Sequence, residues 1–173
     1  APGYDKKDVN ATDILFMSTR AGTEKYDRVF TEAFMRPGLD AQRWRNRSNY
    51  VALNVIPTAP SEVSIYHRSG DRYVLRSDGF VSVNAGSQTG ELVTRPLIFS
   101  GKELHLNLST SAVGLVQVEM QDEAGQPIPG FTLADCPIVY GDGIDLTVKW
   151  KNGRNLSSLV GKPVRVRFVL KEC

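Results

Sequence analysis

Apolar and polar residues alternate most regularly in the second half of the chain. In 103–110 the leucines Leu104, Leu106 and Leu108 share one face, and a similar alternation runs through 114–122 and 163–170. A two-residue period is the repeat of a β-strand with one buried and one solvated face. Further elements are predicted as strands at 80–85, 91–99 and 145–150 and a helical turn at 155–161. Residues 77–173 are therefore predicted to form an antiparallel β-sandwich of about seven or eight strands.

The first part of the chain, residues 1–76, has shorter apolar runs broken by Gly, Pro, Asp and Ser. The strands predicted there are 13–18, 28–35, 50–56, 62–67 and 72–76. Short strands at close intervals, separated by turn residues, are typical of an all-β fold. Because these strands are too few to close a core, we expect this part to form one or two sheets of a larger object.

Composition narrows the class of protein. Apolar residues make up 41% and charged residues 23%, as in soluble globular proteins, and the net charge of +2 gives no reason to expect nucleic-acid binding. No apolar run approaches the roughly 20 residues of a membrane helix. Two cysteines, Cys136 and Cys173, are too few for a disulfide framework or a thiolate metal site. The start "APGYDKK" lacks Met and an apolar signal, so we expect a processed chain or a piece of a longer one.

Two segments carry a family resemblance. The run "EAFMRPGLD" within 13–66 resembles the last part of a five-bladed β-propeller of bacterial glycosidase-like proteins related to glycoside hydrolase families 32 and 43. The segment from "LRSDGFVSVNAG" to "PVRVRFVLKE" is similar to the β-sandwich that follows that propeller. The resemblance implies a partial propeller-like segment at 1–76 and a β-sandwich domain at 77–173. It also implies a secreted or periplasmic protein.

The resemblance further implies a function. The parent would be a polysaccharide-processing hydrolase, to which this chain contributes a carbohydrate-facing edge of the propeller and an accessory sandwich. In such propellers the catalytic carboxyl groups come from several blades, so we expect the isolated chain to be inactive.

One acidic residue, Glu32, is a candidate for catalysis, although the sequence does not identify the catalytic set. Glycoside hydrolysis uses two carboxyl groups about 5 to 10 Å apart. Glu32 lies between Phe30 and Phe34 in a predicted strand. The alternative is that Glu32 pairs with Arg28 or Arg36 and only orders the sheet.

A sugar site also needs planar hydrogen-bond donors and flat aromatic faces. The residues that fit this requirement, and are predicted to bind substrate, are Arg36, Trp44, Arg47, Asn49, Tyr66 and His67. Tyr50 fits it as well. The alternatives remain open: Trp44 as a loop anchor, the arginines as solvated charge, and His67 with Arg68 as a surface pair.

Two features of the predicted sandwich have two interpretations each. Trp150 either covers a sheet edge or binds a sugar. Asp142 and Asp145 either form an ordinary turn or hold Ca²⁺. His105 has no second His near it in the sequence, which argues against a metal site. No cofactor motif is present, so no metal and no cofactor are expected.

Three functions remain after these arguments. The chain is part of an enzyme, a non-catalytic carbohydrate-binding or structural module, or a sandwich that binds another protein through an exposed strand. The expected partner is carbohydrate, with neither nucleic acid nor membrane. Open sheet edges would also allow self-association.

Overall fold

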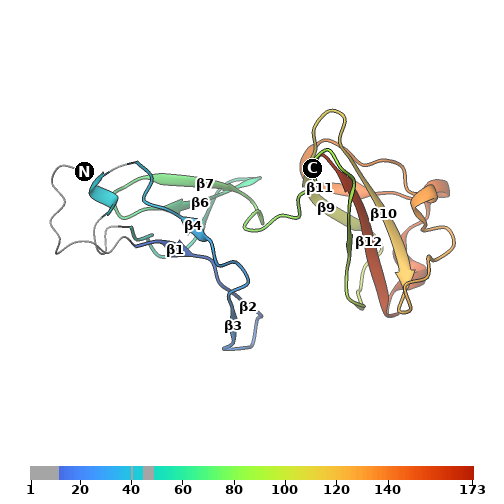
Figure 1. The fold of residues 1–173 in the computed structure, drawn as a ribbon. Coiled ribbons are helices and arrows are strands. Elements are labelled where there is room, and N and C mark those ends of the chain that lie inside the picture. The colour runs from blue at the N-terminus through green and yellow to red at the C-terminus, as the bar shows by residue number, and fades with distance from the viewer. Residues whose placement is uncertain (1–11, 40, 45–48) are drawn as a thin grey trace. The chain divides into compact units, whose positions relative to one another are not determined.

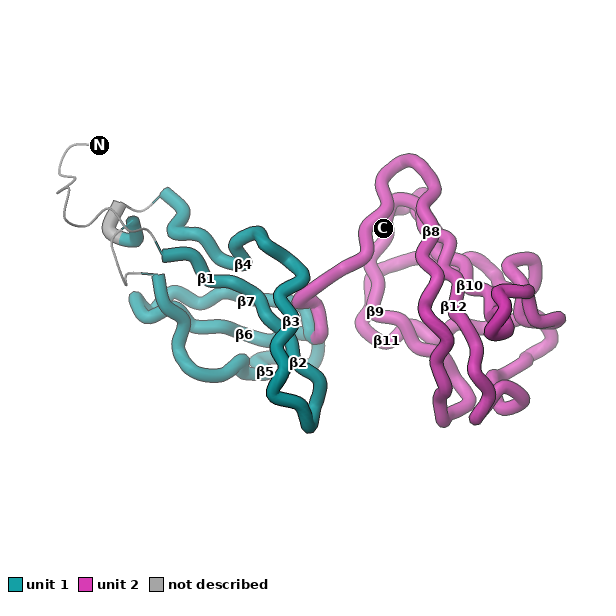
Figure 2. The backbone as a smooth tube through the Cα atoms, turned by 60° about the horizontal axis from the view of Figure 1, so that its bottom comes forward, with its two compact units in different colours: residues 1–77 teal, residues 78–173 magenta. Residues whose placement is uncertain are grey.

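The computed structural model describes residues 12–39, 41–44 and 49–173, and its regular elements are β-strands and short 3₁₀ helices (Figure 1). Every strand pair is antiparallel. The prediction of an all-β protein is confirmed. The described strands form several small sheets and close neither a barrel nor a propeller. The chain divides into two compact units, unit 1 (1–77) and unit 2 (78–173), which Figure 2 colours separately.

The part of unit 1 that the structure describes contains seven short strands and one 3₁₀ helix. They are β1 (Ile14–Leu15), β2 (Ser18–Thr19), β3 (Tyr26–Asp27), β4 (Ala33–Met35), η2 (Ala41–Trp44), β5 (Ile56–Ala59), β6 (Glu62–Tyr66) and β7 (Arg72–Arg76). The strands form the pairs β1–β4 and β2–β3 and the three-stranded sheet β5-β6-β7. The last of these is a meander, in which each strand pairs with the next along the chain.

Two strands predicted in unit 1 are much shorter than expected. The predicted strand 28–35 is reduced to β4, and 50–56 contributes a single bridge, from Val51 to His67, before β5. A strand extends only as far as a partner supplies ladder hydrogen bonds. β4 pairs with β1, which is two residues long, so the ladder ends there. Glu32 therefore lies in a bend before β4, and the prediction that it lies inside a strand is wrong.

Unit 2 contains five regular strands and three 3₁₀ helices, where about seven or eight strands were predicted. They are β8 (Gly90–Val93), β9 (Leu104–Ser109), β10 (Leu115–Asp122), η3 (Leu133–Asp135), β11 (Asp142–Val148), η4 (Lys151–Gly153), η5 (Leu156–Leu159) and β12 (Val164–Lys171). One sheet has the order β10-β12-β8, and the other pairs β11 with β9. The helical turn predicted at 155–161 is confirmed as η5.

Two predicted strands of unit 2 fail for identifiable reasons. The segment 80–85 pairs only at its last residue, where Ala85 exchanges backbone hydrogen bonds of 2.9 and 3.0 Å with Cys173. The segment 91–99 stops pairing regularly at Val93, because Pro96 has no N–H to donate to a ladder. Pairing resumes beyond the proline as one bridge between Leu97 and Val164.

Unit 2 has one hydrophobic core to which both of its sheets contribute. The buried residues are Ala85, Val116, Val118, Met120, Phe131, Cys136, Val148, Trp150, Leu156, Leu159, Val164, Val166 and Leu170, and the leucines of β9 pack against them. The alternation in β10 and β12 directs every second side chain into this core. Trp150 lies within it at 3% exposure, which is against its interpretation as a sugar platform. Its Nε1 donates to the backbone carbonyl of Val118 on β10, the end strand of its sheet, which agrees with its interpretation as cover for a sheet edge.

Candidate functional site

Two of the predicted substrate-binding residues, Asn49 and His67, lie in a group of polar side chains around one guanidinium group, that of Arg43 in η2. Its Nη2 donates to Asn49 Oδ1 at 2.8 Å, and its Nη1 donates to the hydroxyl of Tyr73. The same Nη1 lies 3.9 Å from Asp71 Oδ2. We call Arg43, Asn49, His67, Asp71 and Tyr73 the Arg43 cluster. The contacts of this cluster connect η2 and the segment at Asn49 to the hairpin β6–β7.

Asn49 is a structural member of this cluster. Its side chain is buried, at 1% exposure, and its Nδ2 donates to the carbonyl of Met35 at 3.2 Å. Because its carbonyl oxygen already accepts from Arg43, both ends of the amide are used within the protein. Asn49 therefore connects Arg43 to β4, and its amide is not presented to a ligand.

His67 takes part in a local network that closes the turn between β6 and β7. Its Nδ1 accepts from the backbone N–H of Ser69 at 3.1 Å and lies 2.5 Å from Ser69 Oγ, which donates to Asp71 Oδ2 at 2.7 Å. A catalytic triad needs the imidazole between the hydroxyl and the carboxylate. Here the hydroxyl is in the middle, and His67 is buried. The side chains of His67, Ser69 and Asp71 therefore stabilise the turn between β6 and β7 and do not form a catalytic triad.

Two aromatic rings beside the Arg43 cluster are exposed. Trp44, 41% exposed, directly follows Arg43, and Tyr50, 45% exposed, directly follows Asn49. Trp44 Nε1 donates to the carbonyl of Gly38 at 2.8 Å. Since this bond fixes the indole, the ring is held in place with part of its surface in solvent. Such a ring suits stacking against the C–H face of a sugar.

The remaining predicted residues do not join this group. Glu32 and Arg36 are exposed on either side of β4, and no ion pair joins them within the described part of the chain. Tyr66 and His67 are neighbours in sequence and so point to opposite faces of their sheet, which separates Tyr66 from the Arg43 cluster. Arg47, like Asp40, lies outside the described residues.

The other face of the sheet β5-β6-β7 carries a network that the sequence analysis missed. Arg72 donates from Nε to Ser64 Oγ at 2.8 Å and from Nη2 to Thr58 Oγ1 at 3.1 Å, and it forms an ion pair with Glu62. Thr58 Oγ1 also donates to Glu62 at 2.7 Å. Ser64 is fully buried in the middle of this network. The network links all three strands and is structural.

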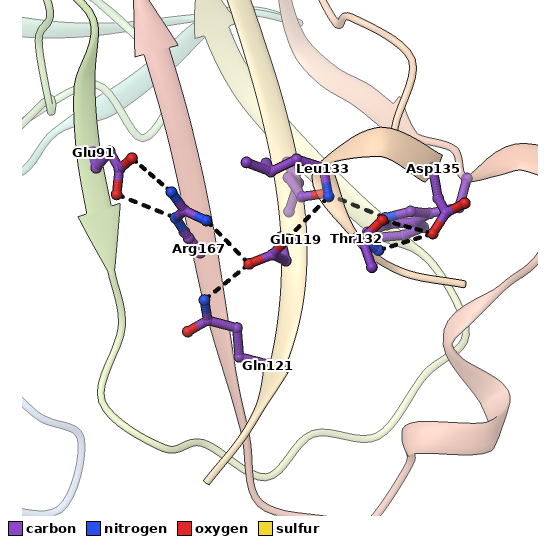
Figure 3. Close-up of polar contacts among 9 residues, drawn as sticks. Glu91, Glu119, Gln121, Thr132, Leu133, Asp135 and Arg167 are labelled. Atoms are coloured by element: carbon purple, nitrogen blue, oxygen red, sulfur yellow. Dashed lines mark hydrogen bonds and ion pairs between the residues drawn. The ribbon is translucent and has the colours of Figure 1, made fainter. Parts of the chain in front are cut away.

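Unit 2 contains a buried carboxylate, Glu119, in the middle of β10 (Figure 3). At 4% exposure its Oε1 accepts from Gln121 Nε2 at 2.9 Å and from Arg167 Nη1 at 3.2 Å. Its Oε2 accepts from the backbone N–H of Leu133 at 3.2 Å. We call these residues, with Glu91, the Glu119 network. Because a buried charge is tolerated only when it is paired and hydrogen-bonded, this set of partners explains how Glu119 remains buried.

The network extends across three strands. Arg167 on β12 also binds Glu91 on β8 in a bidentate pair, with Nη2 to Oε1 at 2.6 Å and Nε to Oε2 at 3.1 Å. Hydrogen bonds from Arg167 lower the pKa of Glu91. The hydrogen bond from Arg167 to Glu91, and to a smaller extent the one to Glu119, raise the pKa of Arg167 above its usual value. The three ionised side chains therefore join β8, β12 and β10, and through Leu133 they anchor the segment 131–136.

The same segment is stabilised at the start of η3. The hydroxyl of Thr132 donates to Asp135 Oδ2 at 2.8 Å, and the backbone N–H of Thr132 donates to the same oxygen at 3.2 Å. These two bonds lower the pKa of Asp135. The segment 131–136 covers the polar face of β10. The expectation that this face is solvated is therefore wrong, and β10 is buried on both sides.

On the other sheet, the exposed side chain of His105 lies close to two carboxylates. His105 Nδ1 lies 2.7 Å from Asp145 Oδ1, and its Nε2 lies 3.4 Å from Glu103 Oε2. The carboxylate of Asp145, one of the two predicted calcium ligands, is thus engaged by His105. Within the residues that the structure describes, no three His, Cys, Asp or Glu side chains are placed to hold a metal ion. Both cysteines are free thiols.

No helix in the described ranges is long and apolar enough to cross a membrane. Comparisons of the chain with protein-family models, with curated proteins and with solved structures find no match. The family resemblance therefore stays a prediction.

Proposed function

We propose that this chain is a non-catalytic part of a polysaccharide-processing protein similar to the five-bladed glycosidase-like propellers. Unit 1 would supply an edge of a propeller whose exposed aromatic residues face carbohydrate. Unit 2 would be the accessory β-sandwich, with its two sheets packed over one core. Hydrolysis of a glycosidic bond would take place in the assembled propeller, because its carboxyl pair draws on several blades.

The observation that carries this proposal is the difference between the interiors of the two units. In the described part of unit 1, the buried apolar residues are Met35, Pro37 and Ile65. Its large apolar side chains that remain exposed are Leu15, Met17, Tyr26, Val29, Phe30, Leu39, Trp44, Tyr50, Val51, Leu53, Val55, Ile56 and Val74. Sheets with so little buried surface need to be covered by others. Neighbouring blades of a propeller supply such cover.

The proposed carbohydrate contact is centred on Trp44. Its indole N–H is already bonded to Gly38, so the ring can offer only its surface, which is how aromatic residues contact the apolar side of a sugar. Arg43 and Asn49, which precede Trp44 and Tyr50, are held to each other by a 2.8 Å bond. The two exposed rings therefore each follow a residue whose side chain is bonded to the other's.

The exposed apolar residues of unit 1 also favour a second candidate function, that of a structural module covered by a protein partner. In that case unit 1 would bind protein and no glycan. The two candidates differ in whether Trp44 contacts sugar, and this difference can be measured.

The test is calorimetric titration of the whole chain with neutral polysaccharides of plant, algal and microbial origin, together with hydrolysis assays on aryl glycosides. We expect weak binding without release of sugar. Trp44→Ala is expected to weaken binding by about tenfold, because an aromatic contact contributes roughly 0.5–1.5 kcal/mol beyond its buried area.

Tyr140→Ala is the matched control, since Tyr140 is an aromatic residue of unit 2 with 68% exposure. It should bind as the unmodified chain does. Hydrolysis by the chain would overturn the non-catalytic assignment. Absence of glycan binding, or binding that is the same in Trp44→Ala, would reject the carbohydrate-facing edge and favour the structural module.

A further inference from the structure

Unit 2 has a polar hollow at the connection between β11 and β12. It is a shallow hollow of about 380 Å³ that is open to solvent. It is lined by Phe131, Asn152, Arg154, Asn155, Ser157 and Ser158, from η4, η5 and the segment before η3. The sequence analysis assigned none of these residues to a site, and the proposed function does not use them.

The guanidinium of Arg154 lies directly against a glycine. A Cβ atom on Gly130 would come within 2.4 Å of Arg154 Nη1 and 2.6 Å of its Cζ, and Gly130 has a φ of +86°. Arg154 Nη1 donates to the carbonyl of Pro129 at 3.5 Å, which is long for a hydrogen bond. No carboxylate in the described ranges pairs with this arginine. The guanidinium of Arg154 therefore packs against Gly130, and most of its five N–H donors remain available to a ligand.

The amide of Asn155 is oriented by the start of η5. Its Oδ1 accepts from the backbone N–H of Ser157 at 3.1 Å. Because only the carbonyl oxygen of an amide can accept this bond, the assignment of oxygen and nitrogen is fixed, and Nδ2 is left to donate. Asn155 therefore adds two N–H donors to those of Arg154, and the hydroxyl groups of Ser157 and Ser158 can donate as well.

The charges around the hollow favour an anion. The lining contains Arg154 and no acidic residue. Asp135 is close enough for Lys151 and Arg154 to contribute to the lowering of its pKa, but its Oδ2 accepts two bonds from Thr132. Phe131 offers no stacking surface, since its ring is buried against Trp150 in an edge-to-face pair with centroids 5.4 Å apart. The ligand is therefore one recognised by its oxygen acceptors.

We propose that this hollow binds the oxyanion of an acidic polysaccharide, a carboxylate or a sulfate ester on a sugar unit. The planar fork of Arg154 matches the two oxygens of such a group, and the Asn155 amide supplies further donors. The inference rests on the proposed function only in taking the oxyanion to be carried by carbohydrate. The site itself belongs to unit 2 and does not involve Trp44.

The test is a titration of the isotope-labelled chain with oligogalacturonate, with a sulfated galactan oligosaccharide, with the neutral galactan oligosaccharide and with inorganic sulfate, followed by NMR. We expect the amides of 152–158 to shift with one or both acidic oligosaccharides and not with the neutral one. Arg154→Ala should weaken this binding by about tenfold or more, as expected for loss of hydrogen bonds to a charged group. Arg95→Ala, which removes the same charge from an exposed position outside the hollow, should bind as the unmodified chain does.

A second variant, Gly130→Ala, keeps the charge and displaces the guanidinium, so it should also lose binding. If it fails to fold, Arg154→Ala still decides the question. Equal losses in Arg154→Ala and Arg95→Ala, binding of neither acidic oligosaccharide, or inorganic sulfate binding as tightly as the oligosaccharides would overturn the proposal. Neutral glycan binding that depends on Trp44, without acidic binding, would leave the proposed function standing and reject this site alone.

Discussion

Replacement of Trp150 by alanine is expected to lower the free energy of unfolding of unit 2 by about 3–5 kcal/mol, the usual cost of removing a buried large aromatic side chain. Trp150 is 3% exposed, packs edge-to-face on Phe131, and donates from Nε1 to the carbonyl of Val118 at 3.3 Å. The variant would lose this packing and leave the Val118 carbonyl without that donor. Urea unfolding of the whole chain, followed by circular dichroism, measures the change.

Tyr140→Ala provides the comparison, because an exposed side chain usually changes stability by less than about 0.5 kcal/mol. If Trp150→Ala unfolds at the same urea concentration as Tyr140→Ala, Trp150 is not part of the core. Glycan binding that disappears in Trp150→Ala while its stability is unchanged would restore the interpretation of Trp150 as a sugar platform.

Replacement of Glu119 by alanine should destabilise unit 2 by about 2–3 kcal/mol. The substitution removes the acceptor of three donors, from Gln121, Leu133 and Arg167. The full cost of breaking a buried ion pair is not expected, because Arg167 keeps its bidentate pair with Glu91 and its side chain is 26% exposed. Urea unfolding again gives the value.

Two variants show whether the buried position is what matters. Glu119→Gln keeps the shape but replaces one acceptor by a donor, so an intermediate loss is expected. Glu91→Gln changes the exposed end of the same network and should cost clearly less than Glu119→Ala. A larger effect at Glu91 than at Glu119 would mean that the bidentate pair, and not the buried carboxylate, holds the three strands together.

Much of unit 2 could be predicted from the sequence, because its strands are long and their partners are present. The alternation in β9, β10 and β12 correctly identified which side chains enter the core. What failed depended on contacts distant in sequence. Glu119 was assigned to a solvated face by the alternation, and nothing near it in the sequence indicates that 131–136 folds over that face. Trp150 lies at the end of the predicted strand 145–150, where the alternation stops. The sequence pattern therefore does not show which face of the sheet its side chain occupies.

Unit 1 was harder to predict for a different reason. Its strands are short, and their lengths depend on partners that a local pattern does not reveal, as the two-residue β1 opposite β4 shows. Asn49 and His67 have the chemistry of ligand-binding residues, but the turn 67–71 and Arg43 use their polar atoms. The pattern does identify the exposed rings of Trp44 and Tyr50 as candidates, since polar and charged residues surround them in the sequence.

The central claim is that unit 2 has a core of its own, whereas unit 1 is the edge of a larger assembly. Amide hydrogen exchange of the whole chain tests it most directly, because exchange reports the free energy of opening residue by residue. The claim predicts slow exchange, through global unfolding, in β10 and β12, and exchange through local opening at clearly lower free energy in β6 and β7. Protection of β6 and β7 equal to that of β10 and β12 would contradict it.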